Sequence, residues 1–253
     1  MQARITQKMI LFLGMFFISF NGITGITTEE KLDLLQNDSI CSVAQHDFKK
    51  FTKSLYYTLG DTSLGYDSFE FAAKGYFNLL RKNKIGKERF FTVIDFSKPS
   101  TEERLFIIDI CYNKIIYKSI VAHGRNSGGL YAKKFSNENN SHQSSIGFYL
   151  TSSTYRSHKY DLALRLDGLE YTNSRASSRG VVMHGADYAT YEFLNHNGML
   201  GRSYGCPAMP YRNFDTVVGW LKQGTCLFIY YPDHSYLRRS KLLNKKDYLT
   251  FFI

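Results

Sequence analysis

The stretch VVMHGADYATYEFLNHNGMLGRSYGCP, residues 181–207, decides what fold and chemistry this chain is expected to have. Its apolar start is typical of a buried strand that ends at His184, and its end presents Cys206 in a polar loop. A thiol attacks as its thiolate, and a neighbouring imidazole takes the proton and later returns it to a leaving amine. The pair therefore predicts nucleophilic catalysis, with Cys206 as nucleophile and His184 as base.

A glycine stands directly before the cysteine. Gly205 lets the backbone turn sharply, so that the N–H groups of Tyr204, Gly205 and Cys206 can converge on a developing oxyanion. The alternative makes Cys206 a small buried residue and His184 a strand-end histidine with satisfied hydrogen bonds. The loop around Cys206 is polar, so a buried apolar residue is not expected there, and this favours the catalytic interpretation.

Outward from this stretch, the hydrophobic pattern is helical before residue 90 and strand-like after it. One or two helices are expected at 29–60, and another from Asp67, whose carboxylate forms a capping box with Glu70. Residues 124–145 are rich in Gly, Ser and Asn, and a loop of this length is commonly functional. The strand-like runs are 90–96, 104–110, 115–121, 146–151, 162–166, 180–184 and 226–231, with a helix at 213–222.

The chain of 253 residues is basic, with 32 Lys and Arg against 22 Asp and Glu and a net charge of +10. This balance favours an anionic surface or polymer as partner. No nucleic-acid-binding motif accompanies the scattered cations, which argues against nucleic acid. A hydrophobic fraction of 43% excludes a disordered chain, and the length predicts one main domain.

The first residues have the layout of a secretory signal peptide. Arg4 and Lys8 precede an apolar run at 9–20, and small and polar residues follow at 21–28. That run is shorter than the about 20 residues that a membrane-spanning helix needs. We therefore expect residues 1–25 to be a signal peptide and the protein to be exported to the periplasm, the cell wall or the medium. An uncleaved membrane anchor is the alternative.

Four cysteines are too few for a disulfide scaffold in a chain of this length. If Cys206 is catalytic, three thiols remain at Cys41, Cys111 and Cys226, of which at most two can pair. An odd thiol in an oxidising compartment is itself a sign that one is kept for chemistry.

A zinc site is a further hypothesis that the sequence allows. His123, His142, His184 and Cys206 are suitable ligand types. No two of them have the short spacing typical of a zinc site, so we expect neither a metal nor a cofactor.

The central stretch resembles the signature of the L,D-transpeptidase (YkuD) catalytic domain, which has a histidine, a spacer and then Ser/Thr-His-Gly-Cys. Here His184-Gly185 is followed, after 17 residues, by Ser203-Tyr204-Gly205-Cys206. The chain is still more similar to a divergent branch, the murein L,D-transpeptidase catalytic domain family proteins, over about residues 65–232. The matching runs are Asp95-Phe96-Ser97 with Pro99-Ser100, Val121-Ala122-His123-Gly124 with Asn126-Ser127-Gly128, Ser141-His142-Gln143-Ser144-Ser145 with Gly147-Phe148-Tyr149, and Gly201-Arg202-Ser203 with Gly205-Cys206-Pro207-Ala208.

The resemblance implies a mostly β catalytic domain of the α+β class, a β-sandwich or barrel preceded by a helical segment. The expected boundaries are 26–88 for the helical segment, 89–232 for the catalytic domain and 233–253 for a basic C-terminal tail. The cations of the tail are expected to form a solvated face with affinity for an anionic wall or membrane surface.

The resemblance also implies a ping-pong mechanism on peptidoglycan stem peptides. Cys206 attacks the carbonyl that joins the diamino acid to D-Ala, D-Ala leaves, and the amine of a second stem resolves the thioester. The carbonyl of Gly185 is implied to orient the imidazole of His184, with Asp187 as the fallback. We therefore expect an exported cysteine acyltransferase. The alternatives are a carboxypeptidase or endopeptidase that hydrolyses stem peptides or crosslinks, and an inactive wall-binding module.

Residues in the matching runs are expected to line the substrate cleft. Arg202 can hold a substrate carboxylate in a bidentate pair. For His123 and His142 the alternative is a solvent-facing position in the loop. The expected substrate-binding residues are Arg202, Ser203, His123, His142 and Asn126.

The chain departs from the family pattern at two positions. Tyr204 stands where the family has histidine, and Ala208 stands where it has asparagine. The base is then His184 alone, and Tyr204 contributes its backbone N–H to the oxyanion hole. Substrate choice, and the balance between transfer and hydrolysis, stay open at this point.

Overall fold

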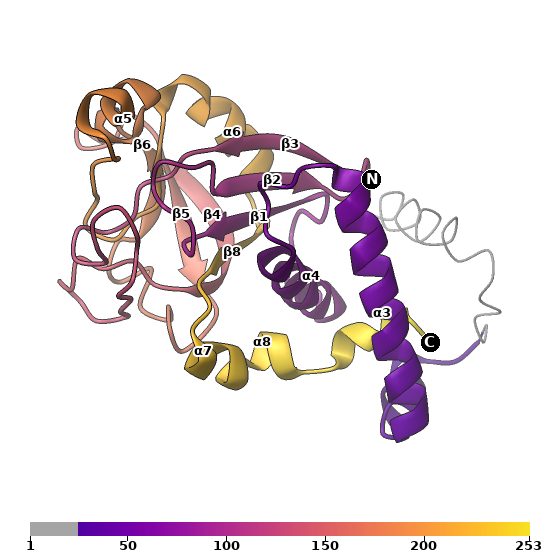
Figure 1. Cartoon of the computed structure of the whole chain (residues 1–253). Helices are drawn as coiled ribbons and strands as arrows, with labels where there is room; N and C mark the ends of the chain where they lie inside the picture. The colour runs from indigo at the N-terminus through magenta and orange to yellow at the C-terminus, as the bar shows by residue number, and fades with distance from the viewer. Residues whose placement is uncertain (1–24) are drawn as a thin grey trace.

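A computed structural model describes residues 25–253 of the chain. The expected signal peptide therefore lies outside the described residues, except for its last position. The described part combines an eight-stranded sheet with helices placed around it (Figure 1). No helix in this part is long and apolar enough to cross a membrane.

Three helices open the described part, as the sequence predicts: α2 (Thr28–Leu34), α3 (Asp38–Leu59) and α4 (Tyr66–Arg81). Thr27 and Glu30 form a capping box at the start of α2. The side chains of such a box satisfy N–H groups that have no partner within the helix.

The predicted cap of α4 is wrong. The helix begins at Tyr66, and its N-cap is Gly65, which has no side chain to accept a hydrogen bond. Asp67 lies in the first turn, where its negative charge interacts favourably with the positive end of the helix dipole. Glu70 forms an ion pair with Lys74 at 3.0 Å instead of closing a capping box.

The strands lie at the strand-like runs that the sequence predicts, with one exception. The exception is β7, whose two residues are too few to show a period. The strands are β1 (Phe90–Asp95), β2 (Leu105–Asp109), β3 (Lys114–Ser119), β4 (Gly147–Tyr155), β5 (Ala163–Gly168), β6 (Val182–Gly185), β7 (Ala208–Met209) and β8 (Cys226–Tyr230). The helices among and after them are η1 (Asp187–Ala189), α5 (Tyr191–Asn197), η2 (Tyr211–Asn213), α6 (Phe214–Leu221), α7 (His234–Arg239), α8 (Lys241–Asn244) and η3 (Asp247–Phe251).

The sheet is mixed and nearly closes on itself. Its order is β3-β2-β1-β8-β4-β5-β6-β7, with β1–β8 and β6–β7 parallel and the other pairs antiparallel. After β3 the chain continues to the opposite edge of the sheet, where bridges join Ala122 to Ala208 and Gly124 to Ser203. This barrel-like sheet with N-terminal helices confirms the predicted α+β fold class.

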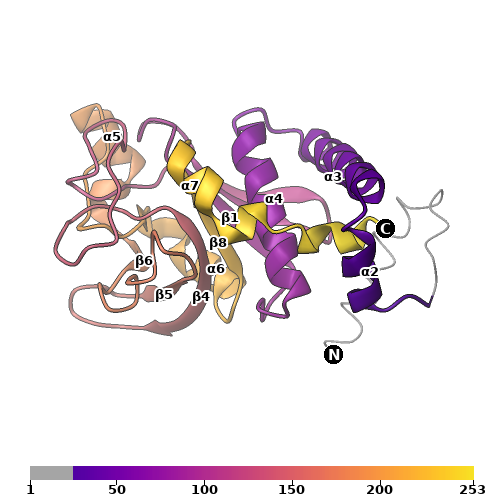
Figure 2. The same ribbon diagram turned by 90° about the horizontal axis from the view of Figure 1, so that it is seen from below.

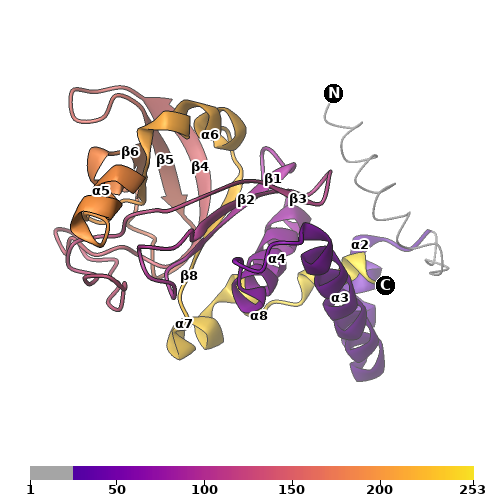
Figure 3. The same ribbon diagram turned by 45° about the horizontal axis from the view of Figure 1, so that its top comes forward.

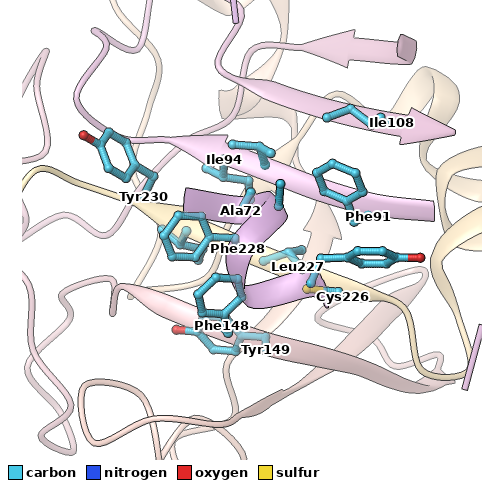
Figure 4. Packing of buried hydrophobic residues seen from close by; sticks show 14 of the residues in the cluster. Ala72, Phe91, Ile94, Ile108, Phe148, Tyr149, Cys226, Leu227, Phe228 and Tyr230 are labelled. Atoms are coloured by element: carbon cyan, nitrogen blue, oxygen red, sulfur yellow. The ribbon is translucent and has the colours of Figure 1, made fainter. Parts of the chain in front are cut away.

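The core lies where α4 packs on β1 and β8 (Figures 3 and 4). Gly75 of α4 makes room for the ring of Phe148, because a Cβ at this position would lie 1.9 Å from that ring. Phe148 in turn stacks on Phe228, with ring centroids 4.2 Å apart. Large aromatic side chains thus supply much of the buried apolar area that joins the helix to the sheet.

The C-terminal segment returns to the N-terminal helices (Figure 2). Leu243, Leu249 and Phe252 are buried. The side chain of Asn78, in α4, donates hydrogen bonds to the carbonyls of Leu242 at 2.7 Å and Lys245 at 3.0 Å. The segment is therefore part of the core, while its cations are exposed: Arg238, Arg239, Lys241, Lys245 and Lys246.

A buried carboxylate ties this segment to the sheet. Glu170, which follows β5, accepts hydrogen bonds from the N–H of Phe148 at 2.9 Å, the hydroxyl of Tyr236 at 2.6 Å and the hydroxyl of Ser240. Burial raises the pKa of the Glu170 carboxyl, and the three donors oppose that rise. Glu170 is thus the common acceptor for a strand and the C-terminal helices.

Replacing Glu170 with alanine is expected to lower the free energy of unfolding by about 3–5 kcal/mol, because three buried donors lose their acceptor. Urea denaturation followed by circular dichroism measures this change. The matched control is Glu29→Ala, at an exposed position of α2, with an expected change below about 1 kcal/mol. A Glu170→Ala protein as stable as the control would contradict the anchoring role.

Candidate active site

Strand pairing brings His184 and Cys206 to neighbouring positions at one edge of the sheet. His184 lies at the C-terminal half of β6 and pairs with Ala208, and its N–H donates to the carbonyl of Pro207 at 3.4 Å. The N–H of Val182 donates to Cys206 Sγ at 3.4 Å. Val182 and His184 are two residues apart, so their side chains point to the same face of the strand. Val182 and Cys206 pack in one small apolar cluster, which places the thiol on the face that carries the imidazole, and both groups are buried.

The carbonyl of Gly185 holds the imidazole. It lies 2.8 Å from His184 Nδ1. A carbonyl only accepts hydrogen bonds, so Nδ1 carries the proton and Nε2 is left as the basic nitrogen. Burial lowers the pKa of the His184 imidazole below its ordinary value, although the Gly185 carbonyl acts in the opposite direction. The resting imidazole is thus a neutral base.

The thiol of Cys206 is also neutral at rest. Burial raises its pKa, while the Val182 N–H, the charge of Lys159 and the hydroxyl of Tyr160 lower it in part. Sγ lies 3.7 Å from the carbonyl of Gly180, to which the thiol proton can be donated. The arrangement fits a base that removes the thiol proton as sulfur attacks, rather than a preformed thiolate.

Tyr160, in the loop between β4 and β5, covers the pair. Its ring centroid lies 4.3 Å from that of His184, and the ring packs against the small apolar cluster that contains Cys206. Burial raises the pKa of Tyr160, so its hydroxyl keeps its proton near neutral pH. No motif in the sequence marks this residue. Its place follows from the pairing of β5 with β6, in which Ala163, three residues after Tyr160, lies opposite His184.

Serine hydroxyls fix the loop before the cysteine. Ser203 Oγ accepts from the N–H of Gly205 at 3.0 Å and donates to the carbonyl of Cys206 at 2.6 Å. Ser144 Oγ donates to the carbonyl of Gly205 at 3.1 Å. The Gly205 N–H is therefore used inside the loop, and the expected oxyanion donors narrow to the N–H groups of Tyr204 and Cys206.

The loop also requires glycine at position 205. Its φ is +123°, and a Cβ there would lie 2.7 Å from the carbonyl oxygen of Gln143. That carbonyl accepts a hydrogen bond of 2.6 Å from Arg179 Nη2. Any side chain at position 205 would have to displace this fixed carbonyl.

His142, one of the residues expected to line the cleft, lies beside the exposed ring of Tyr204. The ring of His142 is 4.5 Å from it, and the guanidinium of Arg125 lies 5.7 Å from its centroid. Arg202 donates to the carbonyl of Gly128 at 3.1 Å, and it is exposed, as is Asn126. Cationic and aromatic side chains thus lie around Tyr204, two residues before Cys206.

Ser203 and His123 are not where the sequence predicts them. Ser203 is buried and both of its hydroxyl bonds are internal to the loop. His123 is 1% exposed, and its Nδ1 accepts from Arg104 Nη2 at 2.8 Å. Burial and the charge of Arg104 lower the pKa of His123 to about 4. His123 therefore stays neutral and structural instead of facing a cleft or solvent.

Other groups considered for the site lie apart from it. Asp187 is exposed at the start of η1, and the carbonyl of Gly185, not Asp187, accepts the hydrogen bond from His184 Nδ1. Cys41, Cys111 and Cys226 are free, like Cys206. Among residues 25–253 no group of three or more His, Cys, Asp or Glu side chains is placed to hold a metal ion.

Comparison with known proteins gives one family. The model of the L,D-transpeptidase catalytic domain matches residues 61–230. Among solved structures, an L,D-transpeptidase from Mycobacterium smegmatis is 12% identical, with a TM-score of 0.36 over 56% of this chain and 59% of that one. L,D-transpeptidase 3 from Mycobacterium tuberculosis, in complex with a faropenem-derived adduct, is 14% identical, with a TM-score of 0.37 over 56% and 60%.

The similarity is partial. The match spans about three fifths of the length of these solved chains. No curated protein matches the sequence.

Replacing Tyr160 with phenylalanine is expected to slow alkylation of Cys206 by iodoacetamide about threefold at fixed pH. The hydroxyl lowers the thiol pKa, so its loss leaves less thiolate. Site-resolved mass spectrometry gives the rate, and Tyr57→Phe, at an exposed position of α3, is the control. An unchanged or faster rate in Tyr160→Phe would show that the hydroxyl does not act on the thiol.

Proposed function

The chain belongs to the family of L,D-transpeptidase catalytic domains, and from that membership we propose that it is an exported enzyme that acylates Cys206 with a peptidoglycan stem peptide. The acyl group then passes to the amine of a second stem. The signal-peptide layout of residues 1–25 supports export.

One observation carries the proposal. His184 Nδ1 is held by the Gly185 carbonyl at 2.8 Å, while the Val182 N–H, two residues earlier on the same strand, donates to Cys206 Sγ at 3.4 Å. This leaves Nε2 as the basic nitrogen on the face where the thiol lies.

The chemistry proceeds in two halves. In the first, Nε2 of His184 takes the thiol proton as Sγ of Cys206 attacks the carbonyl that joins the diamino acid to D-Ala. The N–H groups of Tyr204 and Cys206 stabilise the oxyanion. The C–N bond then breaks, His184 gives the proton to the leaving amine of D-Ala, and a thioester remains.

In the second half, an amine of another stem peptide attacks the thioester. His184 takes a proton from this amine and returns it to the sulfur as the C–S bond breaks. The products are a new amide between two stems and the free thiol. If water attacks in place of the amine, the same site acts as a carboxypeptidase.

The surroundings of the site suit an anionic substrate. Arg125 lies beside the exposed ring of Tyr204, and Arg202 is exposed on the neighbouring backbone. Stem peptides carry carboxylates that such guanidinium groups attract. The net charge of +10 adds a general attraction to an anionic wall or membrane surface.

Cys206→Ser is expected to abolish release of D-Ala from a stem tetrapeptide, and His184→Ala to reduce it by at least about 100-fold. The reason is that a serine hydroxyl is a far weaker nucleophile than a thiol, and without the imidazole no group takes the proton. Mass spectrometry of the products measures release and separates transfer from hydrolysis. Circular dichroism of each variant checks folding.

His46→Ala is the matched control for the histidine, because His46 is exposed in α3. It is expected to keep more than about a tenth of the activity. A folded Cys206→Ser protein that released D-Ala at the wild-type rate would refute the proposal.

The pH dependence follows from the lowered pKa of His184. The reaction needs the unprotonated imidazole, and burial keeps that form to lower pH than for an ordinary histidine. As pH rises through the lowered pKa, kcat/KM is expected to increase and to level off, with the midpoint of this acid limb below about pH 6.5. A pH–rate profile measures it, and a midpoint above 6.5 would contradict the buried neutral base.

A further inference from the structure

A second cavity lies away from the residues of the candidate site. It has a volume of about 600 Å³ and lies between the start of β1, the turn from β2 to β3, and the end of α6. Phe90, Tyr112 and Trp220 contribute aromatic rings to its wall. Tyr112 is 65% exposed, although it is a large aromatic residue. An open cavity whose wall combines aromatic rings with charged side chains is a candidate ligand site.

One acidic group of the wall is already saturated. Asp109 Oδ2 accepts two hydrogen bonds from Arg89, at 2.9 and 2.7 Å. Its Oδ1 accepts from the N–H groups of Cys111 at 3.0 Å and Tyr112 at 3.3 Å. Asp109 therefore fixes the wall and leaves the charges of the lysines around the cavity uncompensated.

Two lysines of the wall have no carboxylate partner within 4.0 Å in the described part of the chain. Lys114 Nζ lies 5.6 Å from the ring centroid of Tyr112. Lys87 Nζ donates to the carbonyl of Gly219 at 3.1 Å and lies 5.5 Å from the ring of Phe90. The remaining acid, Glu88, has a carboxyl pKa that burial raises, which favours its neutral form. The cavity thus joins flat aromatic faces to ammonium groups.

We propose that this cavity binds a saccharide ring that bears a free carboxylate, the chemistry of a muramic acid unit whose stem peptide has been removed. The apolar face of a pyranose stacks on the ring of Tyr112 or Trp220, and Lys114 pairs with the carboxylate. The carboxyl oxygens of Glu88 accept hydrogen bonds from the sugar hydroxyls. This inference rests on the proposed function, because the saccharide belongs to peptidoglycan, the polymer on which the enzyme is proposed to act.

The site would hold the enzyme on glycan strands while the distant thiol acts on stem peptides. A ring whose lactyl group is still amide-linked to a stem has no free carboxylate at that position. The cavity would therefore favour strands on which a reaction that cleaves the lactyl–peptide amide has already acted.

The chain offers a direct reporter for this cavity, since Trp220 is its one tryptophan. Tryptophan fluorescence of the full protein is titrated with N-acetylmuramic acid and, in parallel, with N-acetylglucosamine, the same ring without the lactyl carboxylate. We expect saturable quenching or enhancement by N-acetylmuramic acid with an affinity at least about fivefold higher than for N-acetylglucosamine.

Lys114→Gln and Tyr112→Ala change exposed side chains and are expected to weaken binding of N-acetylmuramic acid at least about fivefold. Lys53→Gln, at an exposed position of α3, is the matched control and is expected to bind like the wild type. Equal affinity for the two sugars, no saturable response to either, or unchanged binding in both cavity variants would overturn the proposal.

Binding and turnover are measured separately, so the two proposals fail separately. Cys206→Ser should bind N-acetylmuramic acid like the wild type, because the thiol takes no part in the cavity. Lys114→Gln should release D-Ala from a free stem tetrapeptide at the wild-type rate, since that substrate has no sugar. A wild-type protein that releases D-Ala but shows no saturable response to N-acetylmuramic acid would refute only the cavity assignment.

Discussion

The position of the nucleophile depends on one short strand that is held from both sides. On one side β7 pairs with β6, where Ala208 lies opposite His184. On the other side the N–H of Ala122 donates to the carbonyl of Ala208 at 2.7 Å, and the N–H of Ser203 donates to the carbonyl of His123 at 3.0 Å. Cys206 lies between Ser203 and Ala208, the two residues that these hydrogen bonds hold. Its backbone is therefore fixed relative to the imidazole, and a shift would break hydrogen bonds on both sides.

Burial sets the protonation of the pair. It raises the pKa of the thiol and lowers that of the imidazole, so both shifts favour neutral groups. The sequence pattern gives no measure of burial and so does not show the resting charge of the thiol. With both groups neutral at rest, the proposed reaction needs the imidazole to take the proton as sulfur attacks, so the orientation of His184 by Gly185 matters more than the resting charge of Cys206. Tyr160 adds a hydroxyl that favours the ionised sulfur and a ring that keeps water from the pair.

Sequence patterns predicted the elements that carry a period, and they missed what depends on distant contacts. The long helices show a period of 3.6 residues, and several strands are short apolar runs that are buried throughout, as in β1, β2, β6 and β8. β7 has only two residues, so no pattern marks it, although it fixes Cys206. His123 belongs to a run that matches the family, yet Arg104, 19 residues earlier, draws it into the interior. Tyr160 lies in an irregular loop that closes over His184. No local spacing of residues in the sequence predicts this contact. The sequence indicated a basic C-terminal tail because the apolar residues of this segment, which are buried in the structure, alternate with lysines and arginines.

Covalent acyl transfer through Cys206 is the central claim, and trapping the intermediate tests it most directly. The protein is mixed with a stem tetrapeptide, quenched in acid during turnover, and digested for peptide mapping by mass spectrometry. The account predicts that the Cys206 peptide gains the mass of the acyl group that remains after D-Ala leaves, and that hydroxylamine removes it, as expected for a thioester. Turnover with the acyl group on another residue, or without any acyl group on Cys206, would contradict the account.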